Sequence, residues 1–312
     1  MIKGIAEQQM ATMMKEVKQR KPRIGKVEDV NVAAKKKVVR KLKMDDKEEE
    51  DTTKYQLITL TAGDCAENHA RMEQIGQKRA AWQGFTVEEL EAICAKMTAN
   101  GAVCELVNLS TEASEHPKDA AVVLVIRNGV NHLLGSETGH QDMFAEQMKL
   151  TFDTKALMRG RVVNKHARHN LCYDDEGREA DYAAGKGTIV GYKDVPLMRN
   201  LMDKYEEVFG EKAAGIKMES NLYYDVRSTG IGFHGDTERV IVIAARIGHA
   251  SLPMHFQWFY KSEPVGTRMV IPMEPGDVYI MSEKAVGTDW MKKNTMTLRH
   301  ATGCEKFTAI KE

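Results

Sequence analysis

The pattern of hydrophobic and polar positions divides the 312-residue chain into three parts. Residues 1–54 carry a basic block followed by an acidic block, which buries little apolar surface, so we expect a charged and flexible tail. Residues 55–158 alternate between strand-like and helix-like patterns and predict an N-terminal α/β extension. Residues 159–312 open with a polar stretch and continue as short apolar runs, and we expect them to form one domain built mainly of strands.

The clearest helix of the extension is predicted at residues 85–101. Thr86 and Glu89 have the spacing of a capping box, and Gly101 stands just past the last turn. The other elements predicted for the extension are a strand at 55–63, a helix at 67–80, strands at 102–110 and 120–130, and a helix with a loop at 143–158.

Short apolar runs dominate the C-terminal part of the chain. An amphipathic helix at 194–210, with Pro196 near its start, precedes them. Beyond Asp236, Val- and Ile-rich runs separated by turns predict about six strands and no helix, which is typical of a two-sheet β-sandwich or jelly roll. We therefore expect an α+β fold with a double-stranded β-helix (jelly-roll) core and an N-terminal α/β extension. The predicted strands lie at 239–248, 252–262, 267–273, 276–287, 295–303 and 306–310.

Composition narrows the possible classes of protein. The formal net charge is zero, so any contact with nucleic acid must come from local basic patches rather than from bulk charge. Five scattered cysteines without a CxxC pair argue against a zinc module or a disulfide framework and suit a reducing compartment. No apolar run is long enough to span a membrane, and the N-terminus lacks the apolar core of a secretory signal. We expect an intracellular protein, in the nucleus or the cytoplasm, with no membrane partner.

The most informative short motif is His234-Gly235-Asp236. Residues two apart on a strand or strand end point the same way, so His234 and Asp236 can aim at one point. With a further His they make the two-His, one-carboxylate triad of non-haem Fe(II) oxygenases, which leaves metal positions open for a co-substrate and oxygen. The motif alone carries little weight, because the chain holds ten His residues.

The third ligand must be a His downstream of Asp236. His249 lies in a loop after the first strand, His255 opens an aromatic run, and His300 lies in a late strand. A jelly roll brings early and late strands together, so we expect His300 to complete the triad.

Residues 159–187 form a polar stretch in which cations alternate with aromatic residues. Cations for phosphates and rings for base stacking suit contact with nucleic acid, whereas an ordinary polar loop over the core is the alternative. The residues predicted to contact substrate are Arg159, Arg161, Lys165, Arg168 and Tyr173.

Several motifs together resemble a known family. The segments NLYYD at 221–225, HGD at 234–236 and ER at 238–239 resemble the core signature of the AlkB-like dioxygenases, which are Fe(II)- and 2-oxoglutarate-dependent enzymes acting mainly on alkylated nucleobases. The resemblance covers roughly residues 187–312. The block MSEKAVG at 281–287, followed by LRHATG, is similar to an AlkB-related subgroup common in algae and large viruses.

The resemblance implies roles for five residues. It implies that His234, Asp236 and His300 bind iron. Asn221 and Tyr223 match an Asn-x-Tyr motif whose side chains hydrogen-bond 2-oxoglutarate in the family.

The sequence departs from the family at its C-terminal end. The family places an Arg after the last His to bind the distal carboxylate of 2-oxoglutarate, but only twelve residues follow His300 and none is Arg. A buried carboxylate needs a cation. Lys306 is the nearest candidate, with Lys311 and Arg299 behind it.

The resemblance also implies that residues 159–187 form a substrate lid. A base would have to be flipped out or single-stranded to reach the metal. The four cations of the lid would then bind phosphates, and Tyr173 would stack on a base. The expected function is oxidation of a methyl or alkyl group on a DNA or RNA base by an Fe(II)/2-oxoglutarate-dependent dioxygenase. The alternatives are a 5-methylcytosine or thymine hydroxylase with a different co-substrate, an oxygenase of protein side chains, and an inactive jelly roll that only binds a partner.

Overall fold

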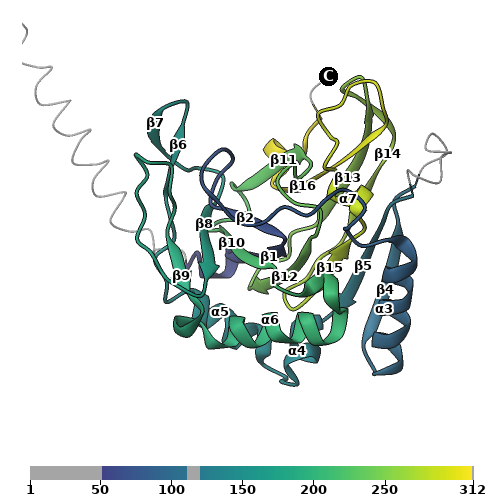
Figure 1. Cartoon of the computed structure of the whole chain (residues 1–312), viewed down its shortest axis with the longest axis horizontal. Coiled ribbons are helices and arrows are strands. Elements are labelled where there is room, and N and C mark those ends of the chain that lie inside the picture. Colours follow the sequence, from purple (N-terminus) through teal and green to yellow (C-terminus); the bar gives the residue numbers. More distant parts are fainter. Residues whose placement is uncertain (1–50, 111–119, 311–312) are drawn as a thin grey trace, which may run out of the picture. The chain divides into compact units, whose positions relative to one another are not determined.

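Two mainly antiparallel β-sheets form the framework of the described part of the chain (Figure 1). The computed structural model describes residues 51–110 and 120–310, so the predicted tail at 1–54 lies outside the described residues except for its last four positions. The strands of the larger sheet are β1 (Leu57–Gly63), β4 (Val103–Asn108), β5 (Val122–Arg127), β8 (His169–Asp174), β9 (Ile189–Gly191), β10 (Lys217–Tyr223), β12 (Ile243–Gly248) and β15 (Val278–Met281). The strands of the smaller sheet are β11 (Gly230–His234), β13 (Met254–Tyr260), β14 (Glu263–Ile271) and β16 (Thr297–Gly303).

Strand order shows how distant parts of the sequence meet. The larger sheet runs β4-β5-β15-β12-β1-β10-β8-β9, and the smaller runs β11-β16-β13-β14. All neighbours are antiparallel except the parallel pair β8 and β9. The larger sheet takes strands from both sides of residue 158, where the sequence pattern predicts a boundary between extension and domain. The residues from Thr52 onward form one compact unit.

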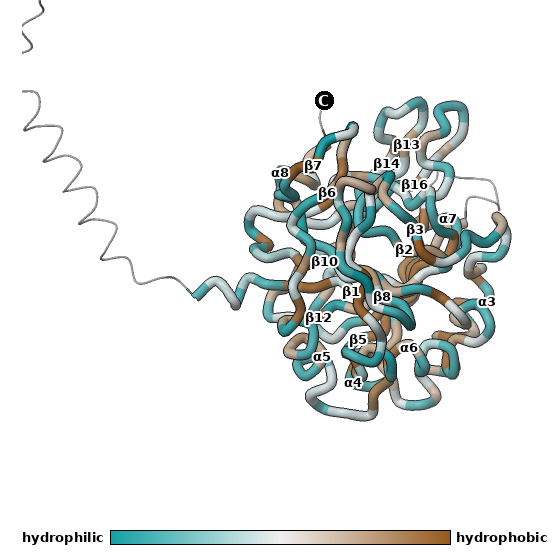
Figure 2. Tube along the Cα trace, turned by 60° about the vertical axis from the view of Figure 1, so that its left-hand side comes forward, coloured by the Kyte–Doolittle hydropathy of each residue, from teal (hydrophilic) through white to brown (hydrophobic). Residues whose placement is uncertain are grey.

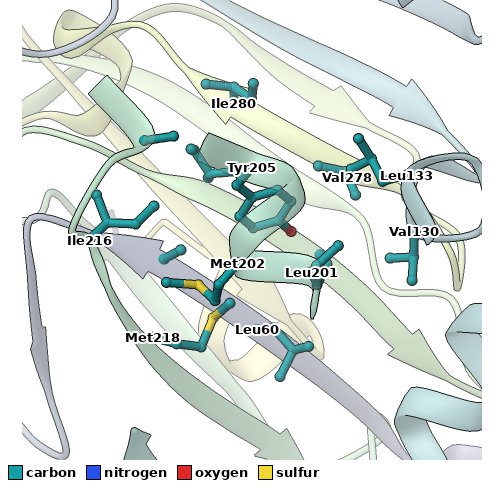
Figure 3. Close-up of a cluster of buried hydrophobic side chains, with 14 of the residues drawn as sticks. Leu60, Val130, Leu133, Leu201, Met202, Tyr205, Ile216, Met218, Val278 and Ile280 are labelled. Carbon is teal, nitrogen blue, oxygen red and sulfur yellow. The ribbon is translucent and has the colours of Figure 1, made fainter. Parts of the chain in front are cut away.

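Helices lie on one face of the larger sheet. They are α3 (Val87–Ala99), α4 (Gly129–Leu134), α5 (Gly139–Gln147) and α6 (Pro196–Phe209), with the short α7 (Glu283–Val286) and α8 (Glu305–Thr308) elsewhere. Figure 3 shows α6 side chains Leu201, Met202 and Tyr205 among Leu60, Met218 and Ile280 of the sheet. None of the helices in the described part of the chain combines the length and apolar character needed to cross a membrane.

The opposite face of the larger sheet packs against the smaller sheet. Alternation along β1 sends Ile58 and Leu60 to the helices and Thr59 to the other side, because successive strand residues point to opposite faces. A second apolar cluster fills part of the space between the sheets, and Trp258 from β13 lies in it with its indole donating to the Leu109 carbonyl at 2.6 Å. The predicted α+β class is therefore confirmed, with more residues in strands, mostly of antiparallel sheets, than in helices. Figure 2 shows apolar residues along the interior strands and hydrophilic ones along the outer loops.

Local signals located two helices correctly. Thr86 caps α3 in a complete capping box with Glu89, and Pro196 is at the start of α6. The strands expected at 55–63, 102–110 and 120–130 are present as β1, β4 and β5.

Three local predictions are wrong. Residues 67–80, predicted as a helix, form the hairpin β2 (Cys65–Glu67) and β3 (Gln74–Gly76) and a following loop. A helix is excluded there because Arg71 and Gly76 have φ of 72° and 87°. The predicted strand at 306–310 is instead α8, and α7 interrupts a region expected to lack helices.

Candidate metal site and cavity

Strand pairing brings two histidines together. His234 ends β11, and its direct cross-strand partner is His300 of β16. Partners in an antiparallel pair project from the same face, and the two imidazole centroids lie 4.4 Å apart. His300 is buried, whereas His234 is half-buried.

Asp236 completes the group from the loop that follows β11. Its Oδ1 lies 3.6 Å from Nε2 of His234 and 3.9 Å from Nε2 of His300. The ligand atoms of all three residues lie within 4.8 Å of one another. Ligands about 2.0–2.2 Å from a shared ion are separated by somewhat less than this, so the group could bind a metal ion after a small contraction.

Two glycines allow Asp236 to reach this position. A Cβ on Gly235 would lie 2.0 Å from the backbone oxygen of Gly287, which follows α7 and has φ of 74°. The amide of Asp236 donates to the carbonyl of Val286 at 3.0 Å. The turn after His234 therefore packs backbone against backbone, and a side chain at position 235 would push Asp236 away.

Hydrogen bonding and burial prepare the two imidazoles as ligands. Nδ1 of His234 lies 2.8 Å from the carbonyl of Gly232 and donates to it, which leaves Nε2 as the nitrogen that faces Asp236. Burial, and then the neighbouring His234, lower the pKa of His300 well below its ordinary value. A metal ligand must be unprotonated, and the lowered pKa of His300 favours that state.

Arg239 balances the negative charge beside the group. Its guanidinium is buried and lies 2.7 Å from Glu219, 2.9 Å from Glu238 and 4.0 Å from Asp236. Burial opposes its charge, but the three carboxylates outweigh burial and hold the pKa of Arg239 well above its ordinary value. Glu219 and Glu238 hold the Arg239 guanidinium in place, and this guanidinium in turn attracts the carboxylate of Asp236.

His234, Asp236 and His300 face a cavity of about 380 Å³ between the two sheets. His234, His300 and Trp290 line one side of it. The larger sheet supplies a row of polar residues on the other side, because Asn221 pairs with Thr59, which pairs with Arg246 on the next strand.

Asn221 and Tyr223 both line this cavity, as the resemblance implies. The Asn221 carbonyl oxygen accepts bonds from Arg168 at 2.8 Å and Asn170 at 2.6 Å, and its amide donates to Glu219 at 3.2 Å. Asn221 is therefore bonded through both its side-chain oxygen and its side-chain nitrogen, and it holds Arg168 at the cavity wall.

Of the three cations expected to bind the distal carboxylate, Lys306 and Arg299 do not line the cavity, and Lys311 lies outside the described residues. Lys306 is exposed on α8, beside the Phe307 ring at 5.6 Å. Arg299 is adjacent to His300 on β16 and therefore faces the opposite side of the strand, over Phe259 at 4.1 Å. Neither residue is placed to bind a ligand in the cavity, because Lys306 lies on the helix α8 that follows β16 and Arg299 faces the other side of β16.

Arg246 is the cavity cation that the sequence analysis missed. It lies in β12 and is 1% exposed. The signal in the sequence is an Arg inside an otherwise apolar run, RVIVIAARIG, at a position where a buried strand normally carries an aliphatic residue.

The predicted substrate residues fall into two groups. Arg168 lines the cavity, and Arg159 and Arg161 are exposed in the hairpin of β6 (Lys155–Met158) and β7 (Arg161–Asn164). These three remain available to a substrate.

Lys165 and Tyr173 belong to the interior instead. The Lys165 ammonium donates to the carbonyl and side-chain oxygens of Asn68 at 3.1 and 2.5 Å and to Asn170 at 2.9 Å. Burial lowers the pKa of Lys165 to about 8. Tyr173 is fully buried and hydrogen-bonds to Gln147 and Ser220, so it cannot stack on a base. Both predictions fail because neither residue belongs to a surface loop: Tyr173 lies in β8, between β10 and β9 of the larger sheet, and Lys165 is buried against Asn68 and Asn170.

The two other candidate histidines lie away from the triad. His249 packs edge-on against Phe144 with centroids 4.9 Å apart. His255 follows Met254, which lines the cavity, and therefore projects from the other face of β13.

Comparison with known proteins adds one relative. No family model matches the chain. A protein described as uncharacterized protein R156, from Acanthamoeba polyphaga mimivirus, is 44% identical over 253 residues, which cover 80% of this chain and 96% of that protein.

Proposed function

The chain belongs to the same family as the mimivirus protein R156, and we propose that it is an Fe(II)- and 2-oxoglutarate-dependent dioxygenase built on a double-stranded β-helix. Its substrate is a methyl or alkyl group on a nucleic-acid base. The observation that carries the proposal is the convergence of His234, Asp236 and His300 on one cavity between the sheets.

The donor set fits Fe(II). Two neutral imidazoles and one carboxylate are the ligands used by non-haem iron oxygenases, and three protein ligands leave positions open for a chelating co-substrate and oxygen. When bound, iron and 2-oxoglutarate would supply the oxidation, in which oxygen gives one atom to succinate and one to a substrate C–H bond while CO2 is released.

The cavity walls of the protein suit the polar edge of a base. Burial raises the pKa of Glu67, which lines the cavity, to about 7. Near neutral pH this carboxyl is partly protonated and can either donate or accept a hydrogen bond. Arg168 also lines the cavity and can orient such an edge.

A cation and an aromatic ring on the cavity wall support a nucleic-acid substrate. Trp290 supplies an aromatic ring and Arg168 supplies a guanidinium to the cavity wall. Rings stack on bases and guanidinium groups bind phosphates, and such contacts suit a single strand or a flipped nucleotide.

Succinate formation from 2-oxoglutarate tests the proposal. The purified chain with Fe(II) is incubated with a panel of methylated single- and double-stranded DNA and RNA. We expect succinate to rise with one class of nucleic acid, with formaldehyde released from an N-methyl group or a hydroxymethyl base retained from a C-methyl group.

Two other outcomes assign the alternatives. Succinate that no nucleic acid stimulates would favour an oxygenase of protein side chains. A chain that binds neither Fe(II), Mn(II) nor Co(II) would favour an inactive jelly roll that only binds a partner, and would contradict the proposal.

A further inference from the structure

Arg246 is a buried cation held only by hydroxyl groups. Its Nη1 donates to Thr59 Oγ1 at 2.6 Å and its Nη2 to Thr302 Oγ1 at 3.3 Å, while Nε is buried without an acceptor. The face of Tyr279 lies 5.8 Å from the guanidinium. All four residues line the cavity that the triad faces.

No carboxylate neutralises this guanidinium within the described ranges of the chain. The other buried arginine of the cavity, Arg239, has Glu219 and Glu238 within 3 Å. Arg246 forms no ion pair with any described Asp or Glu, although it is equally buried. An isolated buried charge is unfavourable, so the site is built to receive an anion.

The surrounding hydroxyls are oriented for such an anion. Thr302 donates its proton to the carbonyl of Pro253 at 2.8 Å, so its lone pairs face Arg246. Thr59 accepts from Arg246, and its own proton has no acceptor among the described residues. An anion beside Arg246 would receive bonds from both the guanidinium and the Thr59 hydroxyl.

The distance to the triad defines the length of the ligand. Thr302 lies two positions beyond His300 on the same face of β16, a separation of about 6.8 Å along a strand. A five-carbon chain with a chelating 2-oxo acid at one end and a carboxylate at the other spans this distance.

We infer that Arg246 binds the distal carboxylate of the 2-oxo dicarboxylic acid whose other end is held at the triad. Arg246 would thus fill, from a different strand, the role that the resembled family gives to an Arg after its last His. The assignment rests on the proposed function for the metal-bound end of the ligand, but the anion site itself rests on Arg246, Thr59 and Thr302.

The test compares two acids that differ only in the distal group. The full chain loaded with Mn(II) is titrated calorimetrically with 2-oxoglutarate and with 2-oxopentanoate, which has the same chain length but no second carboxylate. We expect the wild type to prefer 2-oxoglutarate by roughly 10-fold or more. Arg246→Met should lose this preference, bind Mn(II) normally and bind 2-oxopentanoate no worse than the wild type does.

Two further variants make the result specific. Arg299→Met removes the other candidate cation, which lies outside the cavity, and should keep the full preference. Arg246→Lys keeps the charge without the planar fork, so it should retain an intermediate preference, and it serves if the methionine variant fails to fold.

The outcomes separate the inference from the proposed function. If the wild type binds neither acid in the presence of Mn(II), the proposed function fails and the inference with it. If the wild type prefers 2-oxoglutarate and Arg246→Met keeps that preference, the Arg246 assignment is overturned while the proposed function stands.

Discussion

At the scale of single residues, Gly235 determines whether Asp236 reaches the two histidines. The residue lies between two metal-ligand candidates, and any Cβ there meets the backbone of Gly287. The spacing of His234 and Asp236 could be read from the sequence, but the need for glycine between them could not. It arises from a contact with a segment about fifty positions later in the chain.

Replacement of Gly235 by alanine should weaken metal binding without unfolding the protein. We expect Mn(II) affinity, measured by titration calorimetry, to fall roughly 10-fold or more, because the carboxylate would be displaced from its position. Gly232→Ala is the matched control, since its nearest non-neighbouring atom would be the Phe307 carbonyl at 3.5 Å, an ordinary contact. Unchanged affinity in Gly235→Ala would contradict this account of the turn.

Other residues show what can and cannot be predicted from the local sequence. The expected fold favours His300 over the two other histidines, and the structure pairs His300 directly with His234. Arg246 was missed because a local pattern cannot reveal which face of a buried strand meets a cavity. Lys165 and Tyr173 look like surface residues in sequence, yet both are buried.

At the scale of elements, the signals that cap a helix come from neighbouring residues, whereas strand pairing depends on residues that are far apart in the sequence. Thr86 and Pro196 start their helices as predicted, because a cap acts within one turn. The local pattern predicts a helix where the structure has the hairpin of β2 and β3, because this hairpin is stabilised by residues that are distant in the sequence. Asn68, in the turn of that hairpin, donates to Asp153 at 2.7 Å and accepts from Lys165 at 2.5 Å.

The link between Lys165 and this hairpin should appear in the pH dependence of stability. Burial lowers the pKa of Lys165 to about 8 in the folded chain, whereas an unfolded lysine titrates near 10.5. Between these values the unfolded state binds more protons, so the free energy of unfolding contributed by this group rises with pH through that window, by at most roughly 1.4 kcal/mol per pH unit.

Urea unfolding of the wild type and of Lys165→Met measures this contribution. The stability of the wild type relative to the variant should increase from pH 8 to pH 10. Lys155→Met, at an exposed position of β6, is the control and should show no such trend. A constant difference between wild type and Lys165→Met would show that Lys165 titrates as an ordinary lysine.

At the scale of the whole molecule, the cavity lies between the eight-stranded sheet and the four-stranded sheet. The sequence pattern predicts β1 as a strand, whereas it predicts no strand at the position of β10. The strand order was not readable, since β1 pairs with β10 and β12, far along the chain. The triad, the polar row from Asn221 to Arg246 and the half-protonated Glu67 meet only after these pairings form.

The most direct test of the account measures succinate and oxidised base in the same reaction. The wild type with Fe(II), 2-oxoglutarate and the methylated oligonucleotide that stimulates it best is compared with His300→Ala, which should remain folded and bind metal poorly. The account predicts succinate and oxidised base in equal amounts from the wild type, and neither above background from the variant. Base oxidation that persists in His300→Ala, or a wild type that yields no oxidised base with any nucleic acid, would contradict it.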